Sequence, residues 1–72
     1  MDRELLEKSL AEAERRVIEA ERHVAKQLEF VARLERDNRD PSQAMHLLQQ
    51  FEELQAMHTA DRDRLRKELL KT

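Results

Sequence analysis

The stretch DNRDPS, residues 37–42, is the one place where this chain departs from a helical pattern. Proline fixes φ and disfavours the helical region for the residue before it, so a regular helix is not expected to continue through Asp40 and Pro41. Asp40 is suited to be an N-cap, with Pro41 at the first helical position and Gln43 at capping-box spacing. Asn38 is the residue best able to adopt the left-handed conformation that ends a helix. The stretch therefore predicts that one helix ends near residue 37 and another begins near residue 41.

The turn between the two expected helices is short, which makes them antiparallel neighbours. We expect a first helix over residues 2–37, a turn at 38–41 and a second helix over 41–70, so that residues 1–72 form a single helical hairpin. Each helix would be roughly 45 Å long. The alternative is a continuous helix that is kinked at Pro41 and dimerises end to end or by exchanging helices.

Each expected helix carries an apolar stripe along one side. The stripes comprise Leu6, Leu10, Val17, Val24, Leu28, Val31 and Leu34 in the first helix, and Leu47, Leu48, Phe51, Leu54, His58, Leu65 and Leu69 in the second. The first stripe repeats every seven residues but is wider than a two-position coiled-coil seam, which is typical of a bundle helix that contacts two neighbours. We therefore expect these residues to form the core of the hairpin and an interface with a second chain.

Charge patterning favours the antiparallel arrangement. Residues 2–14 have a net charge of −3 and residues 61–72 a net charge of +2, and a hairpin brings these two segments together. Five acid-to-base pairs are spaced for i,i+4 ion pairs along a helix: Glu4–Lys8, Glu12–Arg16, Glu29–Arg33, Glu35–Arg39 and Asp63–Lys67. Such pairs contribute about 0.2–0.5 kcal/mol each, so burial of apolar side chains has to stabilise the tertiary fold.

The composition argues against catalysis and against cofactor or metal binding. The chain has no glycine and no cysteine, which excludes glycine-rich phosphate loops, nucleophile elbows, disulfides and thiolate zinc sites. The Glu-x-x-His spacing of carboxylate-bridged metal sites in bundles is also missing. We therefore predict no catalytic, cofactor-binding or metal-binding residues, and no enzyme.

The net charge of −2 and the lack of Tyr and Trp argue against a nucleic-acid partner. No apolar run approaches the length of a membrane span, and the first residues resemble neither a signal peptide nor a transit peptide. We expect a soluble, cytoplasmic protein with no membrane association.

His58 lies on the apolar side of the second helix, and counting back from the turn places it opposite residues 20–21. One hypothesis is that it is bonded to Glu21 and makes assembly sensitive to pH. The simpler interpretation is a polar residue that fixes the register of a seam. His23 raises the alternative of a phosphotransfer histidine, but the His-x-x-Lys sequence at 23–26 is not followed by the glycine of such motifs.

A chain of this size rarely builds a sufficient core without a disulfide, a metal or a partner. Residues 43–60 hold only two formal charges and add Met45, Met57, Ala56 and Ala60 outside the main stripe, which favours an association surface. We predict a self-association or protein–protein interaction module, forming first a homodimeric four-helix bundle, with a helical protein as the other candidate partner. The alternative is a small nucleic-acid-associated or phosphotransfer regulator.

The segments ERHVA (21–25), VARLERD (31–37), FEELQ (51–55) and DRDRL (61–65) also suggest a family. They resemble short uncharacterised helical-hairpin, or coiled-coil, proteins of alphaproteobacteria, in which an arginine- and glutamate-rich helix is followed by a second helix with a similar end. Many of those proteins have glycine near the turn, where this chain has Asn38 and Arg39. The resemblance implies a bacterial cytoplasmic setting and no assigned activity, so it transfers no functional residues.

Overall fold

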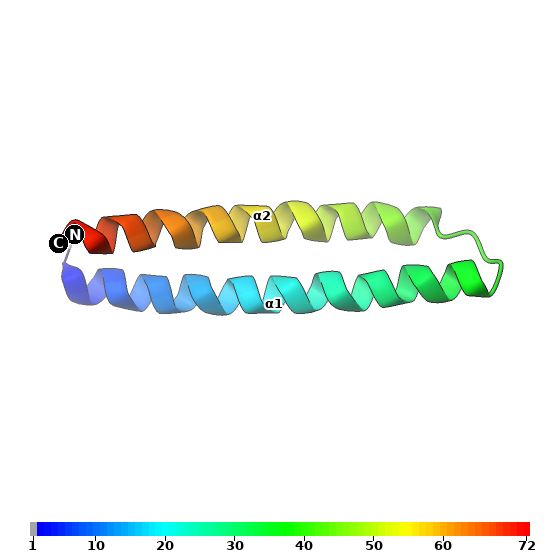
Figure 1. Ribbon diagram of the computed structural model, residues 1–72, viewed down its shortest axis with the longest axis horizontal. Helices are drawn as coiled ribbons and strands as arrows, with labels where there is room; N and C mark the ends of the chain where they lie inside the picture. The colour runs from blue at the N-terminus through cyan, green and yellow to red at the C-terminus, as the bar shows by residue number, and fades with distance from the viewer. Residues whose placement is uncertain (1) are drawn as a thin grey trace.

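The computed structural model describes residues 2–72, which form two α-helices and no strand. Helix α1 (Arg3–Arg36) and helix α2 (Ser42–Leu70) run antiparallel and lie side by side along their whole length (Figure 1). The molecule measures 54 × 14 × 13 Å, so it is a rod two helices wide. The all-α hairpin predicted from the sequence is confirmed.

The end of α1 is a Schellman motif. Asn38 has φ of 56°, the left-handed conformation predicted for it. The Asn38 N–H donates to the Glu35 carbonyl at 3.2 Å, and the Arg39 N–H donates to the Leu34 carbonyl at 2.8 Å. These two bonds satisfy carbonyls that would otherwise be left without partners at the helix end.

Asp40 organises the start of α2, one residue later than predicted. Its Oδ1 accepts hydrogen bonds from the Ser42 backbone N–H at 3.0 Å and from the Ser42 hydroxyl at 2.6 Å. The helix begins at Ser42, so Pro41 is its N-cap residue, and the prediction of Asp40 as the N-cap with Pro41 at the first helical position is wrong by one residue. The Pro41 carbonyl accepts the first helical bond, from Met45 N–H at 2.8 Å. No hydrogen bond joins Gln43 to Asp40 within the described residues, so the reciprocal half of the expected capping box is not formed.

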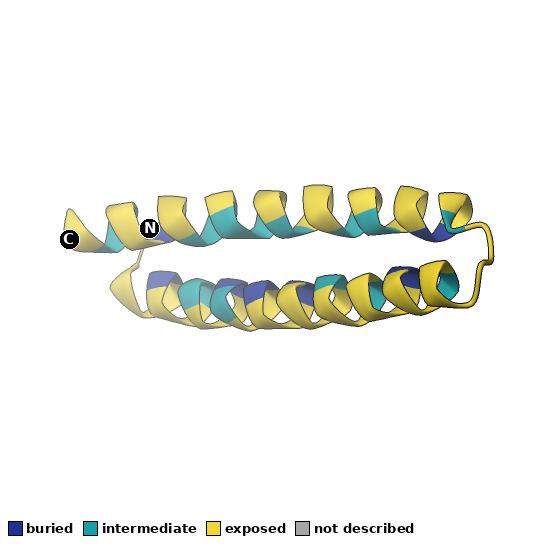
Figure 2. Cartoon of the chain, turned by 45° about the vertical axis from the view of Figure 1, so that its right-hand side comes forward, coloured by how far each residue is buried: buried dark blue, intermediate teal, exposed yellow. Residues whose placement is uncertain are grey.

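The two helices meet along a seam whose residues are spaced alternately by three and four. All its members are buried or half-buried (Figure 2). The seam consists of Leu6, Leu10, Ala13, Val17, Ala20, Val24, Gln27, Val31 and Leu34 from α1, and of Ala44, Leu48, Phe51, Gln55, His58, Arg62, Leu65 and Leu69 from α2. This spacing is that of a two-stranded coiled coil. The core of the hairpin is thus narrower than the stripe predicted from the sequence.

The best-packed part of the seam lies near the free ends of the helices. Leu6, Ala13 and Leu65 form a buried cluster there, against which Leu10 and Leu69 pack. Arg3 and Thr72 hold the two ends of the chain together, with 3.1 Å between Arg3 Nη1 and Thr72 Oγ1. The core is small, because three of the seven residues that are buried in the described part of the chain are alanines.

Of the five predicted i,i+4 ion pairs, Glu12–Arg16 is formed among the described residues, at 3.6 Å. Glu35–Arg39 cannot form as a helical pair because Asn38 ends the helix before Arg39. The acidic start and the basic end of the chain do come together as predicted, since Arg66 Nη2 lies 3.1 Å from Glu14 Oε2 across the two helices. These side chains are exposed, so the ion pairs contribute little to stability.

The turn predicts a contrast between two substitutions at position 38. Asn38→Gly should leave stability equal or raised, because glycine adopts positive φ without a Cβ penalty, whereas Asn38→Val should lower it by about 1–2 kcal/mol. Urea unfolding followed by circular dichroism, at one fixed protein concentration, measures both. Equal stability of the two variants would contradict the assigned turn geometry.

The hydrogen bonds that Asp40 accepts from Ser42 predict a pH dependence of stability. The hydrogen bonds from the Ser42 hydroxyl and backbone N–H lower the pKa of Asp40 below its ordinary value of 3.8. A carboxyl group whose pKa is lower in the folded than in the unfolded chain stabilises the fold at pH values above its unfolded pKa. This stabilisation is lost as the pH falls through the folded pKa. We expect Asp40→Ala to be less stable than wild type at neutral pH and the difference to vanish in strong acid. Urea unfolding of both proteins across this pH range tests the expectation, and a difference that persists in acid would argue against a stabilising role for these hydrogen bonds.

Candidate association surfaces

The middle of the seam is polar on the side of α2. Gln55, His58 and Arg62 are consecutive seam residues there, and α1 offers small seam residues such as Ala13 and Ala20. Small residues leave room for the long polar side chains to lie along the seam while their polar ends reach water. The Arg62 side chain is 23% exposed, and its Nη2 lies 3.1 Å from Asp63 Oδ1.

Gln27 is the polar seam residue of α1, and among the described residues it forms the one side-chain hydrogen bond that joins the two helices in the half nearer the turn. Its Nε2 donates to the backbone carbonyl of Ala44 at 2.9 Å. Within residues 2–72, no buried side-chain nitrogen or oxygen lacks a hydrogen-bond partner. The polar residues of the seam therefore fix the register of the helices without leaving a buried polar atom unpaired.

His58 lies opposite Ala20, in the region predicted for it. It lines a shallow hollow together with Arg16, Glu19, His23 and Leu54. No hydrogen bond or ion pair joins His58 to Glu21 among the described residues, so the structure lacks the contact on which the pH-switch hypothesis was based. The position agrees with a half-buried residue of the seam.

The other two histidines make local contacts. His23 stacks on Phe51, with ring centroids 5.5 Å apart and an interplanar angle of 24°. His46 Nε2 lies 3.5 Å from Gln50 Nε2 on the exposed side of α2. Over the part of the chain that the structure describes, no three side chains of His, Cys, Asp or Glu are grouped to hold a metal ion.

Of the residues predicted for the core and interface, three lie outside the seam. Leu28 is 50% exposed, Leu47 40% and Leu54 41%. The others are buried or half-buried between the helices: Leu6, Leu10, Val17, Val24, Val31, Leu34, Leu48, Phe51, His58, Leu65 and Leu69. Gln27, Gln55 and Arg62 belong to the seam but were not among the predicted interface residues. Their alternating three- and four-residue spacing from Val24, Phe51 and Leu65 is the signal that identifies them.

The seam divides the remaining surface into two flanks. One is marked by the hollow where His23 and Glu19 of α1 meet Leu54 of α2. The other is marked by the ion pair of Glu14 with Arg66. Because the seam repeats every seven residues, residues seven apart on one helix lie on the same flank.

The first flank is electrically balanced, and we call it the neutral flank. Its helical members are Leu5, Ser9, Glu12, Arg16, Glu19, His23, Lys26, Phe30 and Arg33 of α1, and Gln43, Leu47, Gln50, Leu54, Met57, Asp61, Arg64 and Glu68 of α2. It has four acids and four bases. Five of its large apolar side chains are exposed: Leu5 54%, Phe30 45%, Leu47 40%, Leu54 41% and Met57 60%.

The second flank is strongly acidic, and we call it the acidic flank. Its members are Glu4, Glu7, Ala11, Glu14, Ile18, Glu21, Ala25, Leu28, Ala32 and Glu35 of α1, and Met45, Gln49, Glu52, Ala56, Thr59, Asp63, Arg66 and Leu70 of α2. It has seven acids, and Arg66 is the one base. Its exposed large apolar residues, Ile18, Leu28, Met45 and Leu70, lie among these carboxylates.

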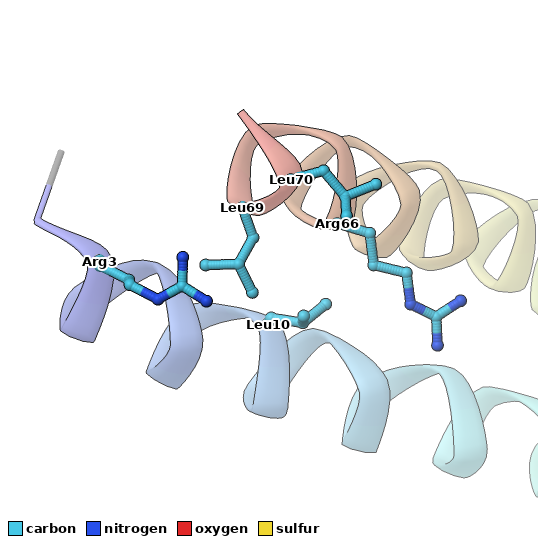
Figure 3. A pocket seen from close by; sticks show the side chains of 5 residues that line it. All are labelled: Arg3, Leu10, Arg66, Leu69 and Leu70. Atoms are coloured by element: carbon cyan, nitrogen blue, oxygen red, sulfur yellow. The ribbon is translucent and has the colours of Figure 1, made fainter. Parts of the chain in front are cut away.

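At the free ends, the acidic flank contains an apolar hollow between Leu10, Leu69 and Leu70 (Figure 3). Arg3 and Arg66 also line it. Both guanidinium groups already have carboxylate partners, since Arg3 Nε lies 3.1 Å from Glu7 Oε1 and Arg66 pairs with Glu14. The hollow therefore offers apolar surface but no unpaired cation for an anionic ligand.

Comparison with protein-family models, with curated proteins and with solved structures found no match to this chain. Neither helix in the described residues has an apolar segment of the length needed to cross a membrane.

The polar seam predicts the effect of removing the imidazole of His58. Among the described residues this side chain makes no hydrogen bond, and leucine suits a half-buried coiled-coil position, so His58→Leu should raise stability by about 1 kcal/mol. Urea unfolding at fixed protein concentration measures this. Glu21→Gln serves as the control and should change little. A loss of stability in both variants would instead support a bond between His58 and Glu21.

Proposed function

We propose that this protein is a non-enzymatic self-association module that forms a dimer of hairpins, a four-helix bundle. The observation that carries the proposal is the area of its surface. The chain exposes 5713 Å² for a mass of 8.6 kDa. A compact monomer of this mass is expected to expose about 4,700 Å², so the hairpin has an excess of roughly 1,000 Å².

The excess is of the size that a protein interface covers. Stable interfaces bury about 800 Å² on each partner. A second hairpin laid along one flank of the first would cover such an area, since the flank is as long as the 54 Å molecule. Two hairpins then form four helices around a shared core, the simplest closed arrangement.

The exposed apolar side chains give the association its driving force. Among residues 2–72, nine large hydrophobic residues are at least 40% exposed, from Leu47 at 40% to Leu70 at 87%. The seam itself buries few large side chains, because alanines and polar residues occupy much of it. Burial of the exposed residues against a second chain would add the stabilisation that one pair of helices lacks.

The proposal predicts the mass in solution. Sedimentation equilibrium should give twice the 8.6 kDa mass of the chain at micromolar concentration. The thermal midpoint followed by circular dichroism should also rise with protein concentration, because dissociation is coupled to unfolding. A folded monomer whose thermal midpoint does not depend on protein concentration would overturn the proposal. An increase in sedimenting mass that grows with the concentration of added DNA or RNA would favour the nucleic-acid alternative.

A further inference from the structure

We infer that the second copy docks on the neutral flank, and that it docks antiparallel, with the turn of one hairpin beside the free ends of the other. This inference rests on the proposed self-association and adds the surface and the orientation. Three features of the flanks carry it: the difference in their net charge, the position of their apolar side chains, and the distribution of charge along the neutral flank.

The first feature is the contrast between the flanks. A dimer with two-fold symmetry places the same surface of both copies against each other. On the acidic flank this would bring seven carboxylates of each chain together, with Arg66 as the one base on each side. Like charges brought together in this way oppose association. The neutral flank carries no such penalty, because its four acids equal its four bases.

The second feature is an apolar centre on the neutral flank. The middle of α2 (Ser42–Leu70) is Ala56, and the exposed Leu54 and Met57 lie on either side of that level. A two-fold axis through the middle of the hairpin therefore brings Leu54 of one copy beside the partner's Met57. Apolar residues at the centre with charged residues around them are the usual anatomy of a specific interface.

The third feature is the polarity of charge along the neutral flank. In the half near the free ends, Glu12, Asp61 and Glu68 lie with Arg16 and Arg64. These two arginines are engaged within the chain: Arg16 pairs with Glu12, and Arg64 with both Asp61 and Glu68. This half therefore carries one more carboxylate than it has bases, before the central Glu19 is counted.

The half of the neutral flank near the turn has a net positive charge. Lys26 and Arg33 are its charged residues, and neither forms an ion pair within the described part of the chain. Lys26 and Glu12 each lie seven residues from Glu19, in opposite directions. In the antiparallel dimer, Lys26 of one copy therefore lies beside the partner's Glu12. A parallel dimer would instead place α1 of one copy beside α2 of the partner with both turn halves at one end, so that Lys26 and Arg33 of both copies would gather there without carboxylates on this flank to pair with.

The antiparallel orientation also accommodates Phe30, an exposed aromatic residue in the half of the neutral flank near the turn. Phe30 lies eleven residues from the central Glu19, and Ser9 lies ten residues from it on the other side. The large ring of one copy is thus placed beside a small residue of the partner, near its exposed Leu5. Alternation of large and small residues across the interface allows the two copies to approach closely.

A matched pair of double variants tests the surface. Leu47→Gln with Leu54→Gln removes two residues of the neutral flank that are 40% and 41% exposed, and Ile18→Gln with Leu28→Gln removes two residues of the acidic flank that are 51% and 50% exposed. Both keep the seam intact, and glutamine preserves helix propensity. We expect the first pair to raise the dimer dissociation constant at least about tenfold and the second to change it less than about twofold. Sedimentation equilibrium measures the constants, and circular dichroism verifies that each variant is helical.

A single spin label tests the orientation. The chain has no cysteine, so Arg39→Cys provides one labelling site in the turn. Antiparallel docking predicts a distance between the two labels close to the 54 Å length of the hairpin. Parallel docking would place the labels roughly 10–25 Å apart, the spacing of neighbouring helices plus the reach of the labels.

The outcomes separate the inference from the proposed function. A wild-type protein that sediments as a folded monomer would remove the proposed function and this inference together. A dimer that the Ile18 and Leu28 changes dissociate, but the Leu47 and Leu54 changes do not, would overturn the surface and leave self-association standing. A short distance between turn labels in an intact dimer would overturn the antiparallel orientation.

Discussion

The packing of α1 against α2 depends on one constraint, the alternation of three- and four-residue steps along the seam. This spacing holds over the whole length of both helices, so every turn of one helix presents a seam residue to the other. It also determines what remains outside. Residues next to the seam fall on one flank or the other according to their position in the repeat, so the placement of charged and apolar residues in the sequence decides the character of each flank.

The middle of the seam contributes little apolar burial, and the helices still pack there because the seam continues on both sides. Ala20 of α1 lies near His58 of α2, and the seam positions on either side of His58 are the polar Gln55 and Arg62, so α2 contributes little apolar area there. Contacts nearer the turn add to the register: Gln27 donates to the Ala44 carbonyl, and the ring of His23 stacks on Phe51 at the edge of the seam. Such a hairpin keeps a fixed register but buries little apolar area, so it gains stability when a second chain buries the exposed apolar side chains of one flank. This gain is the physical basis of the proposed dimer.

The turn could be predicted from the sequence because its chemistry is local. A proline, an aspartate before it and an asparagine able to adopt positive φ each restrict the backbone within a few residues. The width of the core could not be predicted in the same way. At 100° per residue, Leu28, Leu47 and Leu54 fall on the apolar stripes, but the helices follow a repeat of 3.5 residues, and the difference moves these residues onto the flanks. The exposed ion pairs were predicted least well, since solvated side chains gain too little from pairing to hold one geometry.

The bond between Arg3 and Thr72 has a further consequence for anything attached to this protein. The start of α1 and the end of α2 lie at the same end of the rod, a molecule's length away from the turn (Figure 1). Polypeptide joined at the two ends would leave side by side, so the hairpin could be inserted into a surface loop of a host domain without separating the strands or helices that flank the loop. It would then act as a stalk that carries its turn far from the host.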